Sequence, residues 1–271
     1  MNDRKGAVAR SLCVLVVLLL AAENSAAATK KRRQKPLPKP KNAVSFEYEY
    51  ETFGSSFKPW MLATAEMSHR FDFGPVIGRV NRARRFGESG TQVEVDAYPR
   101  IGRGMYLYLN AGRSEQQIFP RERFGAELYK NLPNAFETSL GFRQLNFKNS
   151  SVTLFTGTIA KYSGNNYYVA RPYVSHHGSG TSLAAQFTAR TYFATADDYA
   201  SVIATFGKSP TEDITPDAVN RLSSGSVRVT AQRLLIRNVI FSARVGYSDE
   251  QIRLAGHRRG WIVGTGLQRR F

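Results

Sequence analysis

Apolar and polar residues alternate with a period of two along most of the chain after residue 44. The alternation is clearest over 44–51, 61–68 and 91–97, and it returns over 105–111, 136–142, 183–189, 227–231 and 239–247. Successive side chains of a β-strand point to opposite faces of a sheet, so each run predicts a strand with one apolar face. No stretch after residue 44 has the apolar stripe of a helix, and turn-forming residues recur throughout. The chain is therefore predicted to be all-β.

The length of these runs favours a membrane barrel over a soluble β-sandwich. A strand needs roughly 9–11 residues to cross a bilayer, and the runs reach that length. Aromatic residues such as Trp60, Tyr98 and Trp261 lie near the ends of runs, where interfacial girdles belong. The mean hydropathy of −0.34 fits a barrel because every second side chain faces the lumen. We predict a transmembrane, antiparallel, up-and-down β-barrel over residues 44–271.

The last run, 260–271, carries the clearest signal for this class. Val263, Leu267 and Phe271 lie on one face, while glycine and polar residues lie on the other. A final strand that ends in phenylalanine is similar to the recognition signal of outer-membrane barrels. We therefore predict that these three residues form the outer-membrane assembly signal, read by the barrel-assembly machinery.

The number of strands follows from counting the runs. Fourteen are predicted, at 44–53, 60–70, 76–86, 91–100, 104–112, 122–130, 135–147, 151–162, 167–175, 181–193, 198–206, 226–236, 239–248 and 260–271. With an even number of strands, the first strand begins and the last strand ends on the periplasmic side. The longer connections 113–121, 207–225 and 249–259 are expected to face outward. Twelve strands is the alternative if two of the weaker runs are loops.

The N-terminal segment predicts export. A mildly basic start, an apolar run over 12–22 and small residues at 25–28 are typical of a signal peptide, here residues 1–27. An uncleaved anchor is the alternative. Cys13 lies within the apolar run without the small-residue box of a lipoprotein, so the mature chain is expected to lack cysteine and disulfides. Residues 28–43 are basic and proline-rich, which predicts a periplasmic tether that either binds an anionic partner or is a solvated linker.

Charged residues on the inward face form the candidate functional site. The formal net charge is +17, with acids on early strands and bases on later ones. The predicted lumenal charge network consists of Glu47, Glu49, Glu94, Asp96, Arg143, Arg190, Arg228, Arg244 and Arg270. The same strand register adds Lys161 and either Arg79 or Arg82, and strand closure is expected to bring Arg270 beside Glu47 and Glu49. Two interpretations stay open: a structural network that fills the lumen, or a polar conduit that attracts anionic solutes or sugar chains.

An enzyme is the alternative class, because some barrels modify lipids at their outer rim. Such chemistry needs a serine, a histidine and an orienting group held together, and Ser175-His176-His177 is the candidate stretch, in a predicted extracellular turn. Adjacent residues of a strand point apart, however, so we predict no catalytic residue here. No cofactor or metal site is predicted. Nucleic-acid binding follows only from the net charge, and the expected location speaks against it.

Several short motifs indicate a family. The stretches 78–86 (GRVNRARRF) and 92–99 (QVEVDAYP), with Phe119-Pro-Arg, Tyr162-Ser-Gly-Asn165 and Arg171-Pro-Tyr173, occur in this order along the chain. In these motifs the chain resembles the YaiO-type outer-membrane proteins. The resemblance implies an outer-membrane barrel and, because members of that family often accompany glycan-assembly machinery, a role near surface glycans.

These observations together lead to one functional hypothesis. We expect a small conduit or scaffold in the outer membrane that serves surface or secreted polysaccharide handling, with outer-membrane lipid and a glycan or anionic solute as partners. A barrel enzyme that modifies lipid or lipopolysaccharide is the alternative hypothesis.

Overall fold

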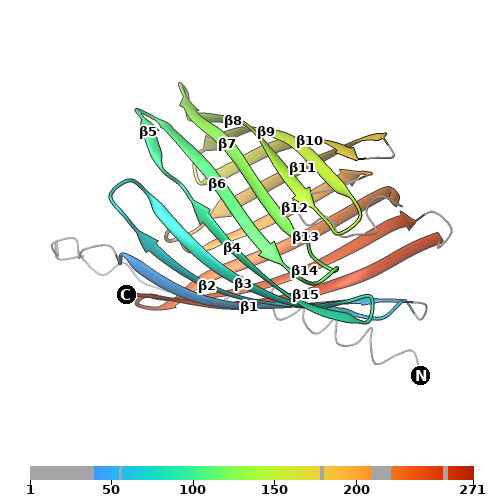
Figure 1. The fold of residues 1–271 in the computed structure, drawn as a ribbon. Coiled ribbons are helices and arrows are strands. Elements are labelled where there is room, and N and C mark those ends of the chain that lie inside the picture. Colours follow the sequence, from blue (N-terminus) through green and yellow to red (C-terminus); the bar gives the residue numbers. More distant parts are fainter. Residues whose placement is uncertain (1–39, 55–56, 178–179, 209–220, 253–255) are drawn as a thin grey trace, which may run out of the picture. The chain divides into compact units, whose positions relative to one another are not determined.

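A computed structural model describes residues 40–54, 57–177, 180–208, 221–252 and 256–271. Within these ranges the strands form one sheet in which all neighbouring pairs are antiparallel (Figure 1). In the same ranges no helix is both long and apolar enough to span a bilayer. The predicted signal peptide 1–27 and most of the predicted tether 28–43 lie outside the described residues. β1 begins at Asn42, two residues earlier than the sequence pattern predicts.

The sheet closes on itself. β1 pairs with β2 on one side and with β15 on the other, and β4 pairs with β6. The three-residue β5 pairs only with the start of β6, and it follows Pro99, which has no N–H to continue the ladder. Apart from β5, fourteen strands make a closed antiparallel barrel. The prediction of an all-β barrel with fourteen strands is confirmed.

The strand bounds are β1 Asn42–Phe53, β2 Trp60–Arg70, β3 Pro75–Arg85, β4 Glu88–Ala97, β5 Arg100–Gly102, β6 Met105–Ser114, β7 Glu122–Leu132, β8 Phe136–Asn146, β9 Ser151–Ser163, β10 Asn166–His177, β11 Gly180–Tyr192, β12 Tyr199–Gly207, β13 Arg221–Ile236, β14 Val239–Ile252 and β15 Gly256–Arg270. Three strands extend further than predicted at the end of the barrel opposite the start of β1 and the end of β15. β13 starts at Arg221, β14 continues to Ile252 and β15 starts at Gly256, so the predicted loops 207–225 and 249–259 are in part strand.

The turns at the two ends of the barrel differ. At the end where β1 begins and β15 ends, β13 and β14 are joined by Arg237 and Asn238 alone. Asn238 adopts a positive φ of 71°, next to a register shift between Leu234 and Ile236. A residue in this left-handed conformation is typical of tight hairpin turns with a bulge. Longer connections, such as 115–121 between β6 and β7, lie at the other end. This asymmetry matches outer-membrane barrels, whose periplasmic turns are short.

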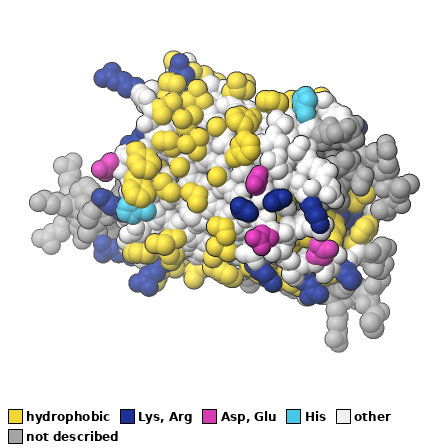
Figure 2. Space-filling view, viewed as in Figure 1, with side chains coloured by type: hydrophobic (Ala, Val, Ile, Leu, Met, Phe, Trp, Pro, Cys, Tyr) yellow, Lys and Arg dark blue, Asp and Glu magenta, His cyan; other side chains and the backbone are white. Residues whose placement is uncertain are grey.

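Alternate side chains face the inside and the outside of the barrel. In β4, Gln92, Glu94 and Asp96 are almost completely buried, whereas Val93 and Val95 between them are 54% and 48% exposed. The polar side chains therefore point inward and the apolar ones outward, the reverse of a soluble protein. Figure 2 shows hydrophobic side chains over much of one outer face. This arrangement is expected of strands that contact lipid.

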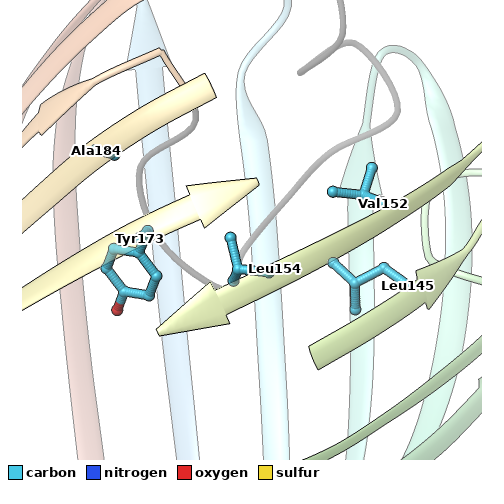
Figure 3. Packing of buried hydrophobic residues seen from close by; sticks show 5 residues of the cluster. All are labelled: Leu145, Val152, Leu154, Tyr173 and Ala184. Atoms are coloured by element: carbon cyan, nitrogen blue, oxygen red, sulfur yellow. The ribbon is translucent and has the colours of Figure 1, made fainter. Parts of the chain in front are cut away.

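Two clusters of buried hydrophobic residues lie inside. On β8 to β11, Leu145, Val152, Leu154, Tyr173 and Ala184 pack together on neighbouring strands (Figure 3). The second cluster contains Ile118 and Phe119 from the connection between β6 and β7, packed on Ala83 and Leu62.

The connection 115–121 therefore folds into the barrel. The segment lies at the end of the barrel that was predicted to face outward from the cell, but its inward course was not predicted. Gly90 faces Ile118, and a Cβ atom at Gly90 would lie 2.8 Å from Cγ1 of Ile118. The glycine leaves the space that the inward-folded connection fills.

Candidate functional site in the barrel lumen

The first group of inward charges joins β2, β3, β4 and β7. Arg79 forms ion pairs with Glu66, with Glu94 at 3.3 Å and with Asp96 at 3.1 Å. Arg123 approaches the other oxygen of Glu94 at 3.2 Å. Glu94 and Asp96 are each only 3% exposed, so their charges depend on these partners. A polar cavity of about 250 Å³ lies against this group, bordered also by the inward-folded connection at Phe119.

A second group is centred on Glu127. Its carboxylate accepts from Arg143 at 2.8 Å, from Arg171 at 3.1 Å and from the hydroxyl of Ser139 at 2.5 Å. Arg143 also lies over the ring of Tyr108, 4.5 Å from its centroid. Both Glu127 and Arg143 are almost fully buried. A buried carboxylate between two guanidinium groups is a structural link between strands β7, β8 and β10.

The third group lies where the barrel closes. Arg244 of β14 pairs with Glu47 and, at 3.5 Å, with Glu49, while Arg228 of β13 reaches Glu49 at 3.6 Å. Glu47 stands opposite Gly266 in the register, and a Cβ atom at Gly264 would lie 2.7 Å from Cγ of Arg244. Glycines on β15 thus give the long side chains of its neighbours room to meet.

Arg270 does not join this group, which corrects our expectation. In the register Arg270 stands opposite Ala43, at the end of β1, and its guanidinium binds both oxygens of Asp197 at 2.7 Å. Asp197 belongs to the connection between β11 and β12, which also contacts Gln232 and Leu234 of β13.

Strands β9 to β13 carry no aspartate or glutamate at all. At the end of the barrel where β15 ends, the inward face of these strands consists of tyrosines around Arg190. The Arg190 guanidinium lies 4.2 Å from the ring centroid of Tyr199, and its Nη1 donates to the Tyr192 hydroxyl at 3.3 Å. Tyr167, opposite Arg190 in the register, stacks on Tyr162 with centroids 4.3 Å apart. Among the described residues, no carboxylate forms an ion pair with Arg190.

The structure places the predicted network residues as follows. Glu47, Glu49, Glu94, Asp96, Arg143, Arg190, Arg228, Arg244 and Arg270 alternate with outward residues and face inward. Of the pair left open, Arg79 faces inward, whereas Arg82 is exposed on the outside beside Thr91. Lys161 was predicted to face the lumen. That prediction is wrong, because its ammonium group lies over the ring of outward-facing Phe136.

Several inward arginines were missed by the sequence reasoning, namely Arg85, Arg123, Arg171 and Arg258. Arg123 shares a strand face with Glu127, and Arg171 shares one with Tyr173, so period-two alternation alone could have placed both. On β15, Val263 and Leu267 face outward and Phe271 bonds to Asn42 through both backbone groups. Their role as an assembly signal stays a prediction.

The candidate catalytic pair is not assembled. Ser175 faces inward and is 1% exposed, whereas His176 points outward and packs edge-on against Phe155. The side chain of His177 lies outside the described residues. No cluster of three or more metal-binding side chains occurs in the described part of the chain.

A family model decides the relationship of the chain. The model of the YaiO membrane beta barrel domain matches residues 41–212, which is more than half of the sequence. The chain belongs to the YaiO family. Among curated proteins, no relative of this YaiO-family chain matches.

Solved structures share the fold at very low sequence identity. The YaiO-family barrel superposes on a bacterial polysaccharide outer membrane secretin with a TM-score of 0.56 and 6% identity, covering 86% of this chain and 99% of that one. It superposes on the Acinetobacter baumannii outer membrane protein Omp33 with a TM-score of 0.52 and 13% identity, covering 86% of this chain and 99% of that one. The superposition on the CymD monoaromatic hydrocarbon channel has a TM-score of 0.55 at 5% identity, covering 86% of this chain and 89% of that one. The family model and the shared fold indicate an outer-membrane β-barrel.

Proposed function

We propose that this barrel is an outer-membrane conduit that favours anionic solutes, in particular sugar chains handled at the cell surface. The observation that carries the proposal is the acid-free wall of β9 to β13 with Arg190 at its centre. Arg190 is the one member of the predicted inward network that has no carboxylate partner within the described residues. An uncompensated guanidinium in a lumen raises the local concentration of anions.

The tyrosines extend this argument from anions to sugars. Tyr162, Tyr167, Tyr192 and Tyr199 come from four consecutive strands and line the same level of the wall as Arg190. Aromatic faces bind the C–H faces of pyranose rings, and a guanidinium binds a carboxylate or phosphate in a bidentate manner. A wall with both features suits an acidic saccharide better than an inorganic anion alone.

The charge groups of the opposite wall have a different part in the proposal. Glu66, Glu94 and Glu127 are neutralised by arginines within hydrogen-bond distance. A paired network contributes rigidity and little net field, so ions moving through the lumen respond mainly to the unpaired wall. The two interpretations left open by the sequence thus apply to different halves of one lumen.

Planar-bilayer recordings with the purified full chain test the proposal. In a potassium chloride gradient we expect a reversal potential that indicates anion preference, reduced at least twofold in permeability ratio by Arg190→Gln. The matched control is Arg82→Gln, which removes the same charge from the outer face. Trigalacturonate added on one side is expected to interrupt the current at lower concentration than maltotriose. Absence of conductance, or a preference that Arg190→Gln leaves unchanged, would overturn the proposal.

A further inference from the structure

A basic patch lies on the outer face of the barrel, apart from the lumen. It consists of Lys58, Arg82, Arg84 and Arg113, at the end of the barrel opposite the start of β1 and the end of β15. The three arginines come from β3 and β6, which flank β4, and all four side chains are exposed. Figure 2 shows Lys and Arg side chains at both ends of the outer face in view, with Asp and Glu side chains among those on the right.

The register confirms that these arginines point outward. Arg82 donates to the hydroxyl of Thr91, which alternates with the buried Gln92. Arg113 stands opposite Val93, a residue that is 54% exposed. The patch therefore borders the apolar band formed by Val80, Val93 and Val95, where the barrel surface leaves the hydrocarbon of the bilayer.

The next feature of the patch is how its charges are paired within the described part of the chain. Among the described residues, none of the four forms an ion pair with a carboxylate. Glu122 stands opposite Arg113 in the register but does not reach it within ion-pair distance. Acidic side chains therefore lie near the patch without pairing with it.

We propose that this patch binds the phosphate groups of a phosphorylated glycolipid in the outer leaflet, that is, of lipopolysaccharide. The start of β1 and the end of β15 face the periplasm, as the short turn between β13 and β14 at that end indicates. The patch, at the opposite end, then lies at the level of the outer-leaflet headgroups. Arginine binds phosphate in a bidentate manner and remains charged at all relevant pH values. Several cations spaced over adjacent strands suit a ligand with more than one phosphate. The proposal is independent of what passes through the lumen.

Native mass spectrometry of the folded full chain in detergent tests this site with diphosphoryl lipid A as the probe. We expect the triple variant Arg82→Gln, Arg84→Gln, Arg113→Gln to bind at least about tenfold more weakly at low salt, because each lost charge-assisted bond weakens binding severalfold. Lys161→Gln, on the outer face at the opposite end, is the matched control and should bind as the parent does. Folding of each variant is checked by its faster migration on gels when unheated.

Two further arms identify the source of the phosphate. Monophosphoryl lipid A with the same acyl chains is expected to bind more weakly than the diphosphoryl form. Inorganic phosphate at millimolar concentration is expected not to displace the lipid; displacement would mean that the patch is a site for free phosphate. Equal affinity of the parent and the folded triple variant for diphosphoryl lipid A would overturn the proposal.

Discussion

Two parts of the barrel wall differ in how their inward charges are paired. One is formed by β1 to β8 and the other by β9 to β13. The strands of the first contain ten acidic residues, and the inward-facing Glu66, Glu94 and Glu127 form ion pairs with arginines. The second has no acid, and its inward face carries serine, threonine, tyrosine and arginine. Paired charges brace strands against one another, while an unpaired charge creates a field in the lumen. The paired charges link strands in one half of the barrel, while the proposed conduit function depends on the unpaired guanidinium of the other half.

The comparison predicts the largest loss of stability at Glu127. Glu127→Gln removes the carboxylate that serves both Arg143 and Arg171, and Arg143 is 2% exposed. Breaking a buried ion pair from one side costs roughly 3–5 kcal/mol. Urea unfolding followed by fluorescence of Trp60 and Trp261 measures the change. Glu88→Gln, at an exposed position of the β3–β4 hairpin, is the control with an expected change below about 0.5 kcal/mol; equal effects of the two would remove the distinction between the walls.

A smaller effect is expected from filling the space at Gly90. In Gly90→Val the new side chain collides with Ile118 and with Cβ of Gln116, which lies 2.9 Å from the position of an added Cβ atom. Overpacking of this kind costs about 1–3 kcal/mol and should drive the connection 115–121 out of the lumen. Single-channel conductance should therefore rise. An unchanged conductance in a folded variant would show that the connection does not restrict the passage.

An acid placed on the acid-free wall should change selectivity more than stability. Thr188 faces inward, two residues before Arg190 on β11. Thr188→Glu brings a carboxylate near the guanidinium, where two charges a few ångströms apart interact by about 1 kcal/mol or more in a hydrated site. We expect the anion preference measured from reversal potentials to fall about fivefold. Thr188→Gln has a similar shape without the charge, and it should keep the parent selectivity.

The smallest effect is expected at Tyr199. Its hydroxyl donates to Gln232 at 3.2 Å, while its ring lies against Arg190. Tyr199→Phe removes only the hydrogen bond, which costs about 1 kcal/mol in unfolding free energy, and should leave anion preference and trigalacturonate block intact. Tyr199→Ala also removes the ring and should weaken the block. If both variants weakened it equally, the hydroxyl rather than the ring would be the contact.

Much of the fold could be predicted from the sequence because the alternation is a direct consequence of strand geometry. Glu94 and Asp96 were placed inward by their spacing alone, and Val93 and Val95 outward. Lys161 was misplaced because lysine on the outer face looks like a break in the pattern, although its stem packs over Phe136 at the edge of the apolar band.

What the sequence could not supply were contacts between distant strands. Asp197 with Arg270, and Arg171 with Glu127, join elements 73 and 44 residues apart, and alternation carries no information about which inward residues meet. The inward course of 115–121 was equally hidden, although the apolar pair Ile118 and Phe119 in a loop was a signal for burial.

The seam between β1 and β15 has a consequence for how the barrel forms. It joins Ala43 to Arg270 and Phe53 to Gly260, residues that are among the most distant in the chain. Until that seam closes, two long strand edges expose unpaired backbone groups that can pair with another chain. Because such long-range pairing is slow relative to hairpin formation, the open intermediate is the species at risk of aggregation, and a catalyst that holds both edges would shorten its lifetime.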